Sequence, residues 1–479
     1  MHPANADPNE LELLRAQKAR LEEDIARLLT IDVLTGLQNR TAFINKVDAA
    51  LKSVKAGNPQ SALIEFGFTG LPRITGSLGR HVGDYLIAAL AARLLAAAEP
   101  GTLSCRLDYK SFALFVPVVQ DALAALTMAK RILAILTASV DWVDRPLTVD
   151  VTAGVALSSG AEHTAESLMQ NAGLAYKSTT NRGGPGYAFF NPALALAARR
   201  RSDIHAALLE GLSANLFSLN YQPFFQAATG ELMGFEALLR FNHPKLGAIS
   251  PVEFIPVAES TGLISKLGSF ALVEACQTAT NWPSNLVVTV NVSPDQFQDG
   301  SILIDVHNAL ELSSLPAYRL EIEVTESTMI GDTEVVLQQL TSLRELGCGI
   351  ALDDFGTGYS SLNYLWKFPF TKLKIDRSFI SATDEQPHMR GIISAIMDIS
   401  RTMGLKVTAE GIETQGHAEL LNAMNCDYIQ GFLTGKPLPA EDLAAVILGK
   451  FARELQTAKK PQVTQATQAS AEVFSLRAG

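Results

Sequence analysis

Apolar runs alternate with helix-like segments along the second half of the chain, from residue 216 onward. Each run has the length of a buried strand, and most of them finish in polar residues. The eight runs are residues 216–225, 233–240, 286–292, 319–325, 349–353, 372–376, 405–409 and 428–432. Eight strands alternating with helices predict an α/β fold, a (β/α)8 barrel of the TIM type. In such barrels the chemistry lies at the carboxyl ends of the strands.

A heptad pattern occupies residues 10–30, near the start of the chain. Leucine dominates the positions that recur at alternating three- and four-residue spacing, which are Leu11, Leu14, Lys18, Leu21, Ile25 and Leu28. This spacing predicts either a short parallel coiled coil or a helix that packs on its own domain. Only about three heptads are present, so the pattern does not decide between the two.

The pattern breaks at Asn191 and Pro192, and residues 193–212 then predict an Ala- and Arg-rich helix. We therefore expect five segments in the chain. They are an N-terminal helix or coiled coil (1–30), an α+β domain (31–191), a linker helix (192–204), the barrel (205–450) and a disordered tail (451–479). The tail is expected to be disordered because it is rich in Gln, Thr, Ala and Ser.

The composition agrees with a protein of two or three globular domains. The chain has 479 residues, of which 47% are hydrophobic and 18% charged, with a net charge of −10. The acidic balance argues against a nucleic-acid polymer as partner. Four scattered cysteines fit a reducing compartment, and neither a signal peptide nor a membrane span is evident. We expect a cytoplasmic protein.

Carboxylates gather where the predicted strands end. The fifth strand finishes in Asp353 and Asp354, and alternation places Glu321 and Glu323 on one face of the fourth strand. Adjacent acids are costly to bury unless a cation binds them, and Mg²⁺ and Mn²⁺ prefer carboxylate oxygen. An N-cap for the following helix is the alternative, although one Asp suffices for a cap. Most other strands also end in polar residues, which favours a metal-dependent site on this rim.

The first domain carries motifs that resemble the GGDEF (diguanylate cyclase) family. Residues 32–40 read DVLTGLQNR, residues 79–84 keep Gly79, Gly83 and Asp84 of a family segment, and residues 151–156 resemble a late central strand. The chemical residues that the family carries are missing. Gly67 and Thr69 replace its metal-binding Asp pair, and residues 108–112 read DYKSF in place of the signature loop.

Further GGDEF positions also differ from the family. Residues 75–76 read TG where the family has Asn-Asp, residues 99 and 102 lack the inhibitory Arg and Asp, and residues 179–180 read TT instead of Ala-Lys. The resemblance therefore implies a catalytically inactive domain that acts as a scaffold, dimeriser or sensor. Residual nucleotide binding is the alternative.

The second domain resembles the EAL family of cyclic-di-GMP phosphodiesterases over its full length. The family-naming motif is Glu236-Ala237-Leu238, and residues 221–223, 249–259, 353–362, 373–376, 409–413 and 430–432 match other motifs. The resemblance implies a barrel enzyme that needs two Mg²⁺ or Mn²⁺ ions and opens cyclic-di-GMP to linear pGpG. Two ions about 3.5–4 Å apart would activate water and clamp the phosphoryl oxygens.

The resemblance also implies a role for individual residues. Its metal ligands would be Glu236, Asn291, Glu323, Asp353, Asp354 and Glu410, with Asp353 shared between both ions. Its catalytic residues would be Lys374, Asp353, Asp354 and Glu410, and Lys374 would act as a charged stabiliser or a proton acceptor. A simple ion pair, with Asp376 or a neighbouring acid, is the alternative for Lys374. Substrate contacts would come from Gln222, Glu236, Leu238, Arg240, Asn291, Asp353, Lys374 and Gln430. Glu326 and Glu413 would steady the loop after the fifth strand.

The sequence thus predicts a phosphodiesterase, and a cyclic-di-GMP-binding effector without turnover is the competing class. Effectors of this kind usually lose acids or the loop after the fifth strand, and these are kept here. We further expect a homodimer, formed through the EAL domain, the N-terminal helix or both.

Overall fold

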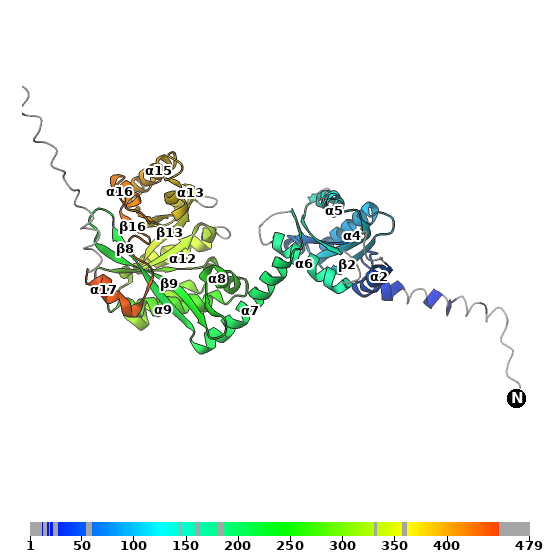
Figure 1. Ribbon diagram of the computed structural model, residues 1–479, viewed down its shortest axis with the longest axis horizontal. Helices are drawn as coiled ribbons and strands as arrows, with labels where there is room; N and C mark the ends of the chain where they lie inside the picture. The colour runs from blue at the N-terminus through cyan, green and yellow to red at the C-terminus, as the bar shows by residue number, and fades with distance from the viewer. Residues whose placement is uncertain are drawn as a thin grey trace, which may run out of the picture. The chain divides into compact units, whose positions relative to one another are not determined.

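The computed structural model describes residues 27–53, 60–143, 145–158, 163–180, 186–329, 333–356 and 362–449, with a few positions between 12 and 22. The chain divides into two compact units, residues 1–200 and 201–479, and each is described by itself (Figure 1). The tail from residue 451 and most of the heptad segment lie outside the described residues. No helix in the described part of the chain is long and apolar enough to cross a bilayer.

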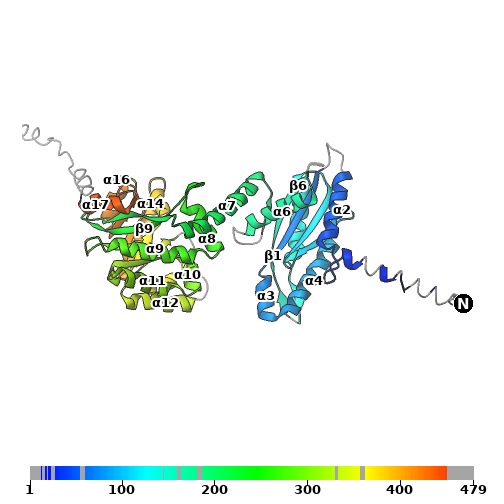
Figure 2. The ribbon, with the colours of Figure 1, turned by 90° about the horizontal axis from the view of Figure 1, so that it is seen from below.

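The first unit is a five-stranded sheet covered by helices on both faces. Its strand order is β2-β3-β1-β6-β7, with β1 antiparallel to both of its neighbours. Figure 2 shows β1 and β6 in this sheet, with α2 and α6 beside them. One core cluster joins the sheet to α4 and α5, and a second joins it to α2 and α6. The elements are α2 (Arg40–Ser53), β1 (Gln60–Thr69), α3 (Leu71–Leu78), α4 (Arg80–Ala97), β2 (Leu103–Asp108), β3 (Ser111–Val119), α5 (Ala122–Thr137), β4 (Val140–Trp142), β5 (Arg145–Leu147), β6 (Asp150–Ser158), α6 (Ala165–Thr180) and β7 (Gly186–Phe189).

The second unit is a closed barrel of eight strands. Going round the barrel, the order is β9-β11-β12-β13-β14-β15-β16-β8, and β8 pairs with β9 to close it. The strands are β8 (Phe217–Gln226), β9 (Leu232–His243), β11 (Val287–Asn291), β12 (Leu320–Thr325), β13 (Gly349–Phe355), β14 (Lys372–Ile375), β15 (Lys406–Ala409) and β16 (Tyr428–Gln430). All eight strands that the apolar runs predict are present.

The barrel departs from strict alternation at its first strand. β8 runs antiparallel to both β9 and β16, whereas the remaining barrel pairs are parallel. Only residues 227–231 separate β8 from β9, with Gly230 at a φ of 71°. A parallel crossover needs about a dozen residues or more, so this connection has to be a hairpin. The expectation of a helix after every strand is therefore wrong at this point.

Helices and two short strands surround the barrel. Helix α7 (Pro192–Ala214) leads into β8 and extends beyond the expected linker, residues 192–204. The other elements are β10 (Gly247–Ile249), α8 (Pro251–Ser260), α9 (Ile264–Ala279), α10 (Pro294–Gln298), α11 (Ile302–Ser313), α12 (Thr333–Leu346), α13 (Leu362–Lys367), α14 (Arg377–Ala382), α15 (Met389–Thr402), α16 (Gln415–Ala423), β17 (Leu438–Pro439) and α17 (Leu443–Ile447), with 3-10 turns at Ala317–Arg319, Glu326–Met329 and Ala440–Asp442.

Candidate active site

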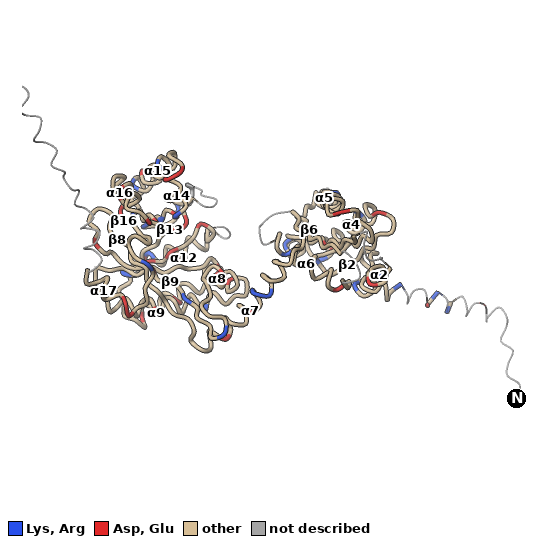
Figure 3. Tube along the Cα trace, viewed as in Figure 1, with Lys and Arg blue, Asp and Glu red and all other residues tan. Residues whose placement is uncertain are grey.

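Polar side chains from all eight barrel strands lie at one end of the barrel, with Asn291 as the contribution of β11. Strand alternation explains this, because Ile322 and Val324 pack in the core while Glu323 between them faces the barrel interior. The other side chains are Gln222 on β8, Glu236 on β9, Glu323 on β12, Asp353 on β13, Lys374 on β14, Glu410 just after β15 and Gln430 on β16. Figure 3 shows acidic and basic positions together near β13 and β16.

Lys374 is the centre of this cluster. Its Nζ lies 2.6 Å from Glu410 Oε1, 2.8 Å from Glu323 Oε2, 3.3 Å from Asp353 Oδ2 and 3.6 Å from Glu236 Oε2. The Lys374 side chain is only 2% exposed. Asp376 instead accepts a hydrogen bond from the backbone N–H of Ser378 at the start of α14. The ion-pair partners of Lys374 are therefore neighbouring acids of the cluster and not Asp376.

Two amide side chains orient Glu236. Asn291 Nδ2 donates to Glu236 Oε1 over 2.7 Å, and Gln430 Nε2 donates to Glu236 Oε2 over 2.5 Å. Gln430 Nε2 also lies 3.4 Å from Gln222 Oε1, and Gln222 Nε2 donates to the carbonyl of Gly435. Both oxygens of Glu236 are thus engaged, which fixes the plane of its carboxylate at the mouth of the barrel.

The cluster carries more negative than positive charge. Burial, opposed by Lys374 and reinforced by Asp353 and Glu236, raises the pKa of Glu410 to about 8. Burial likewise raises the pKa of Glu323 well above its usual range. Lys374 lowers this pKa, but its effect is smaller than the combined effect of burial, Glu236 and Asp353. Four carboxylates share one ammonium, so the site lacks positive charge.

The donor set fits divalent cations chemically. Carboxylate and amide oxygens are the ligands that Mg²⁺ and Mn²⁺ prefer, and the excess negative charge is the charge that such ions neutralise. In the described part of the chain, no three His, Cys, Asp or Glu side chains are arranged as ready ligands of one ion. The acids converge on Lys374 Nζ instead, and the ammonium is the cation that holds them together.

The end of β13 has an unusual backbone. Asp354 adopts a φ of 55°, in the left-handed region, and burial and then Asp353 raise its pKa. Gly356 follows with a φ of 95°, and its N–H donates to Glu326 Oε1 over 2.9 Å. Glu326 therefore holds the start of the loop after β13, the loop that resembles the family motif. Residues 357–361 of this loop lie outside the described residues. Glu413 is exposed at the pocket edge.

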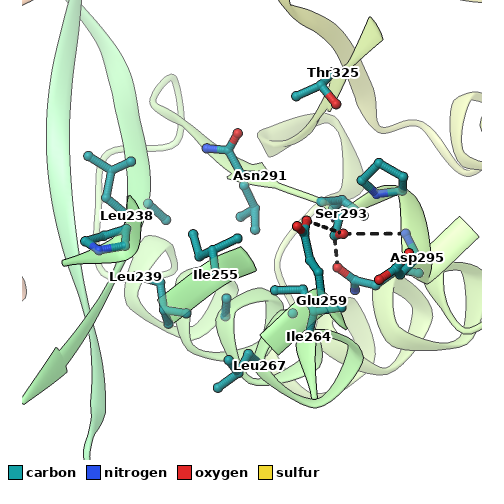
Figure 4. Close-up of a pocket in the computed structure, with 18 of the residues that line it drawn as sticks. Leu238, Leu239, Ile255, Glu259, Ile264, Leu267, Asn291, Ser293, Asp295 and Thr325 are labelled. Carbon is teal, nitrogen blue, oxygen red and sulfur yellow. Dashed lines mark hydrogen bonds between the residues drawn. The ribbon is translucent and has the colours of Figure 1, made fainter. Parts of the chain in front are cut away.

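Two pockets open beside these side chains, and Leu238 lines both of them. The smaller, about 260 Å³, lies over Glu236, Asp353 and Glu410 and reaches the exposed ring of Phe432. The larger, about 490 Å³, is shown in Figure 4. Both Asn291 and Arg240 line the larger pocket, and Arg240 Nη1 also donates to the carbonyl of Leu239.

The larger pocket contains residues that motif analysis left without a role. Its walls are largely apolar, with Ile255 and Ile264 among them, and Glu259 of α8 and Asp295 of α10 add carboxylates to the polar groups of β9 and β11. Ser293 Oγ donates to Glu259 Oε1 over 2.9 Å, and Asp295 N donates to Ser293 Oγ (Figure 4). The Ser293 capping box of α10 is visible in the sequence, but its contact with α8 is not, because the two helices are distant in the chain.

The corresponding region of the first unit is closed by side chains. A Cβ at Gly67 would lie 2.2 Å from the Tyr176 ring, so the ring occupies the space that any side chain at position 67 needs. Asp108 accepts hydrogen bonds from Lys110 N and Ser111 Oγ, which close the turn between β2 and β3. Its carboxylate is thus used within its own hairpin.

Comparisons with known proteins agree with the two-unit structure. Relatives from Pseudomonas aeruginosa include the bifunctional diguanylate cyclase/cyclic di-GMP phosphodiesterase MucR, 34% identical over 91% of this chain and 64% of its own length. The cyclic di-GMP phosphodiesterase NbdA is 32% identical over 93% of this chain and 57% of its own length. The chain thus spans less than two thirds of these relatives.

Solved structures show the same fold. The Vibrio cholerae LapD S helix-GGDEF-EAL structure, bound to c-di-GMP, covers 88% of this chain with a TM-score of 0.53 and 16% identity. Residues 29–184 match the family model described as diguanylate cyclase, GGDEF domain, and residues 205–437 match the EAL domain model. The chain therefore belongs to the family of GGDEF–EAL proteins.

Proposed function

We propose that the chain is a metal-dependent phosphodiesterase that hydrolyses cyclic-di-GMP to linear pGpG. The observation that carries the proposal is the convergence of three buried carboxylates and the half-buried Glu410 on Lys374 Nζ at the mouth of an EAL barrel. Phosphodiester hydrolysis requires relief of negative charge and an activated water at neutral pH. An acid-rich site with one lysine suits both requirements.

Mg²⁺ or Mn²⁺ would be held by the oxygen donors of this cluster, which are Glu236, Asn291, Glu323, Asp353, Asp354 and Glu410. When bound, such ions lower the pKa of water and neutralise charge on the phosphoryl oxygens. The amides of Asn291 and Gln430 keep Glu236 in one orientation. The acids themselves are arranged by the strands that carry them, so the site is largely formed before substrate binds.

Lys374 acts on the water or on the phosphoryl group. Its ammonium is buried among acids, so it is held within the site and cannot turn to solvent. As a cation it stabilises negative charge that develops on the phosphate. Its second candidate role, accepting a proton from water, needs the neutral amine, and the neighbouring acids oppose that form because, against the effect of burial, they raise the pKa of Lys374. Lys374→Arg keeps the positive charge but replaces the ammonium by a guanidinium, which does not act as a base. The pH–rate profile of this variant can therefore separate the two roles.

The larger pocket takes one guanine base of the substrate. Its volume of about 490 Å³ lies in the range of small-molecule sites. Apolar walls cover the faces of a flat ring, and the carboxylates of Glu259 and Asp295 are acceptors for the N–H donors of guanine. Arg240 lies at the same pocket and supplies a guanidinium for a phosphate. The second base lies in the smaller pocket near Phe432.

The first domain is proposed to be inactive as a cyclase and to regulate the barrel. Support comes from Tyr176, whose ring fills the space over Gly67, where the family carries an Asp. Asp108 Oδ1 is engaged in its own turn, where it accepts two hydrogen bonds. We also propose a cytoplasmic homodimer, formed through the EAL domain, the N-terminal helix or both.

The test is direct. Purified protein is incubated with cyclic-di-GMP and Mn²⁺ or Mg²⁺, and the products are separated by chromatography. The proposal expects pGpG from the wild type and none from Glu236→Ala, whose carboxylate is engaged by two amides at the site. Binding of cyclic-di-GMP without pGpG would favour a non-catalytic effector instead, and turnover by Glu236→Ala would refute the ligand assignment.

A further inference from the structure

A second ion pair lies inside the barrel, toward the amino ends of the strands from the candidate site. Lys372 Nζ is 2.6 Å from Glu321 Oε1, and both side chains are buried. Glu321 precedes Glu323 by two residues, and Lys372 precedes Lys374 by two, so alternation directs all four side chains into the interior. The proposed hydrolysis assigns no role to Glu321 or Lys372.

The contacts of Lys372 cross the interior of the barrel. Its Nζ lies 4.7 Å from the ring centroid of Phe224 on β8 and 5.0 Å from that of Tyr428 on β16, and its acid partner is on β12. Strands β13, β14 and β15 separate β12 from β16 in the sheet, so these side chains meet only inside the barrel. Cation–π contacts on two rings and one carboxylate hold the ammonium at a fixed depth.

Strand β13 leaves room for this pair between β12 and β14. A Cβ at Gly349 would lie 3.1 Å from Glu321 Cγ and Oε2, so the missing side chain makes space for the glutamate. Ala351, two residues further on the same face, is also small and fully buried. Acids of β12 and lysines of β14 therefore meet across β13 twice, as Glu321–Lys372 and as Glu323–Lys374.

The two ion pairs, Glu321–Lys372 and Glu323–Lys374, are neighbours inside the barrel, offset by two residues along β12 and β14. A change in one pair therefore acts on the other. A buried carboxylate that loses its partner is strongly unfavourable and attracts the next available cation. For Glu321 that cation is Lys374, which follows Lys372 on the same face of β14. We propose that Lys372 is a positioning residue, which occupies Glu321 and so keeps the Lys374 ammonium among the acids of the site. The inference rests on the proposed function, because Lys374 acts there.

The inference predicts opposed changes in two properties. Without Lys372, the Lys374 ammonium is drawn toward Glu321, and turnover falls because the ammonium leaves the reacting phosphate. The acids of the site then lose a competing cation, so Mn²⁺ binds more tightly. A barrel that is merely loosened would lose turnover and Mn²⁺ affinity together.

The experiment uses the full chain with Lys372→Met, which keeps the length of the side chain without its charge. We expect kcat for cyclic-di-GMP to fall by about ten- to a hundredfold, as for a displaced catalytic group. Mn²⁺ affinity, measured by calorimetry without nucleotide, should increase. In the double variant Glu321→Gln/Lys372→Met, no charge is left to compete, and kcat should return to within about threefold of the wild type.

Lys406→Met is the matched control. Lys406 stands at the start of β15, and its Nζ lies 2.8 Å from Asp427 Oδ1. Unlike Lys372, the Lys406 side chain is exposed. It should leave kcat and Mn²⁺ affinity unchanged. If Lys372→Met does not fold, Phe224→Leu removes one ring from the Lys372 ammonium and should give the same opposed changes at smaller size.

Three results would overturn the inference. The first is a wild-type kcat in Lys372→Met. The second is a joint loss of kcat and Mn²⁺ affinity in that variant. The third is a double variant in which neither kcat nor Mn²⁺ affinity returns to the wild-type value. If the wild type makes no pGpG, the proposed function fails separately. The calorimetry still tests the positioning, because Mn²⁺ affinity should rise in Lys372→Met and return to the wild-type value in the double variant.

Discussion

Replacing Lys374 by methionine should leave the acids at the barrel mouth without their shared counter-charge. Four carboxylate oxygens lie 2.6 to 3.6 Å from its Nζ, and the side chain is 2% exposed. Removing one partner of a buried ion pair typically costs about 3–5 kcal/mol. In a domain of this size each kcal/mol lowers the melting temperature by about 2–4 °C, so we expect a decrease of about 10 °C.

The melt is measured with EDTA and then with Mn²⁺. Divalent ions supply the charge that the variant lacks, so Mn²⁺ should raise its melting temperature more than that of the wild type. The loss in EDTA should be larger at pH 9 than at pH 6. In the wild type burial raises the pKa of Glu410 to about 8, so at pH 6 this acid is mostly protonated and gains less from the ammonium. Lys406→Met is the control and should shift the melt little.

Equal melting temperatures of Lys374→Met and wild type in EDTA at pH 9 would refute the reasoning. The result would mean that the acids do not depend on the ammonium for their charge balance. A variant that is destabilised equally with and without Mn²⁺ would also contradict the account, because it would separate the acids from ion binding.

Three further predictions concern other residues. Glu65 has a pKa raised to about 7 by burial and then by Asp108, so the folded state holds a proton that the unfolded state loses above pH 4.5. Stability should therefore decrease from about pH 4.5 to pH 7, and Glu65→Gln should remove roughly 2–3 kcal/mol of that dependence in urea titrations. Phe432→Ala should raise KM about tenfold with little change in kcat, because an exposed ring at the pocket stacks on a base. Glu326→Ala should lower kcat about tenfold without a matching change in KM, since the Gly356 N–H loses its acceptor; unchanged steady-state kinetics would remove Glu326 from the account.

Much of the barrel could be predicted because its strands are buried on both sides. Apolar runs such as that of β12 specify strands, and the polar residues that interrupt them mark the interior face. The direction of β8 could not be predicted, because an apolar run does not indicate whether the strand pairs in parallel or antiparallel with its neighbours. Its antiparallel course follows from the short connection at Gly230, which reads as a turn only once its neighbours are known strands.

Pairings between distant strands were also beyond the sequence. Glu321 is visible as an acid on the interior face, but its partner Lys372 stands on another strand with no spacing that connects them. The same holds for Tyr176, which fills the space over Gly67 from a helix late in the domain. Sequence patterns specify which face a side chain occupies, and tertiary packing decides what it meets there.

The central claim is that the acids around Lys374 form a hydrolytic site that works only with divalent ions. The most direct measurement is the initial rate of pGpG formation by the EDTA-dialysed full chain as Mn²⁺ is added back. The account predicts no product before addition, a rate that rises with Mn²⁺ to a plateau, and no rise in Glu236→Ala. Product formation that is unaffected by EDTA, or cyclic-di-GMP binding with no pGpG at any Mn²⁺ concentration, would contradict it.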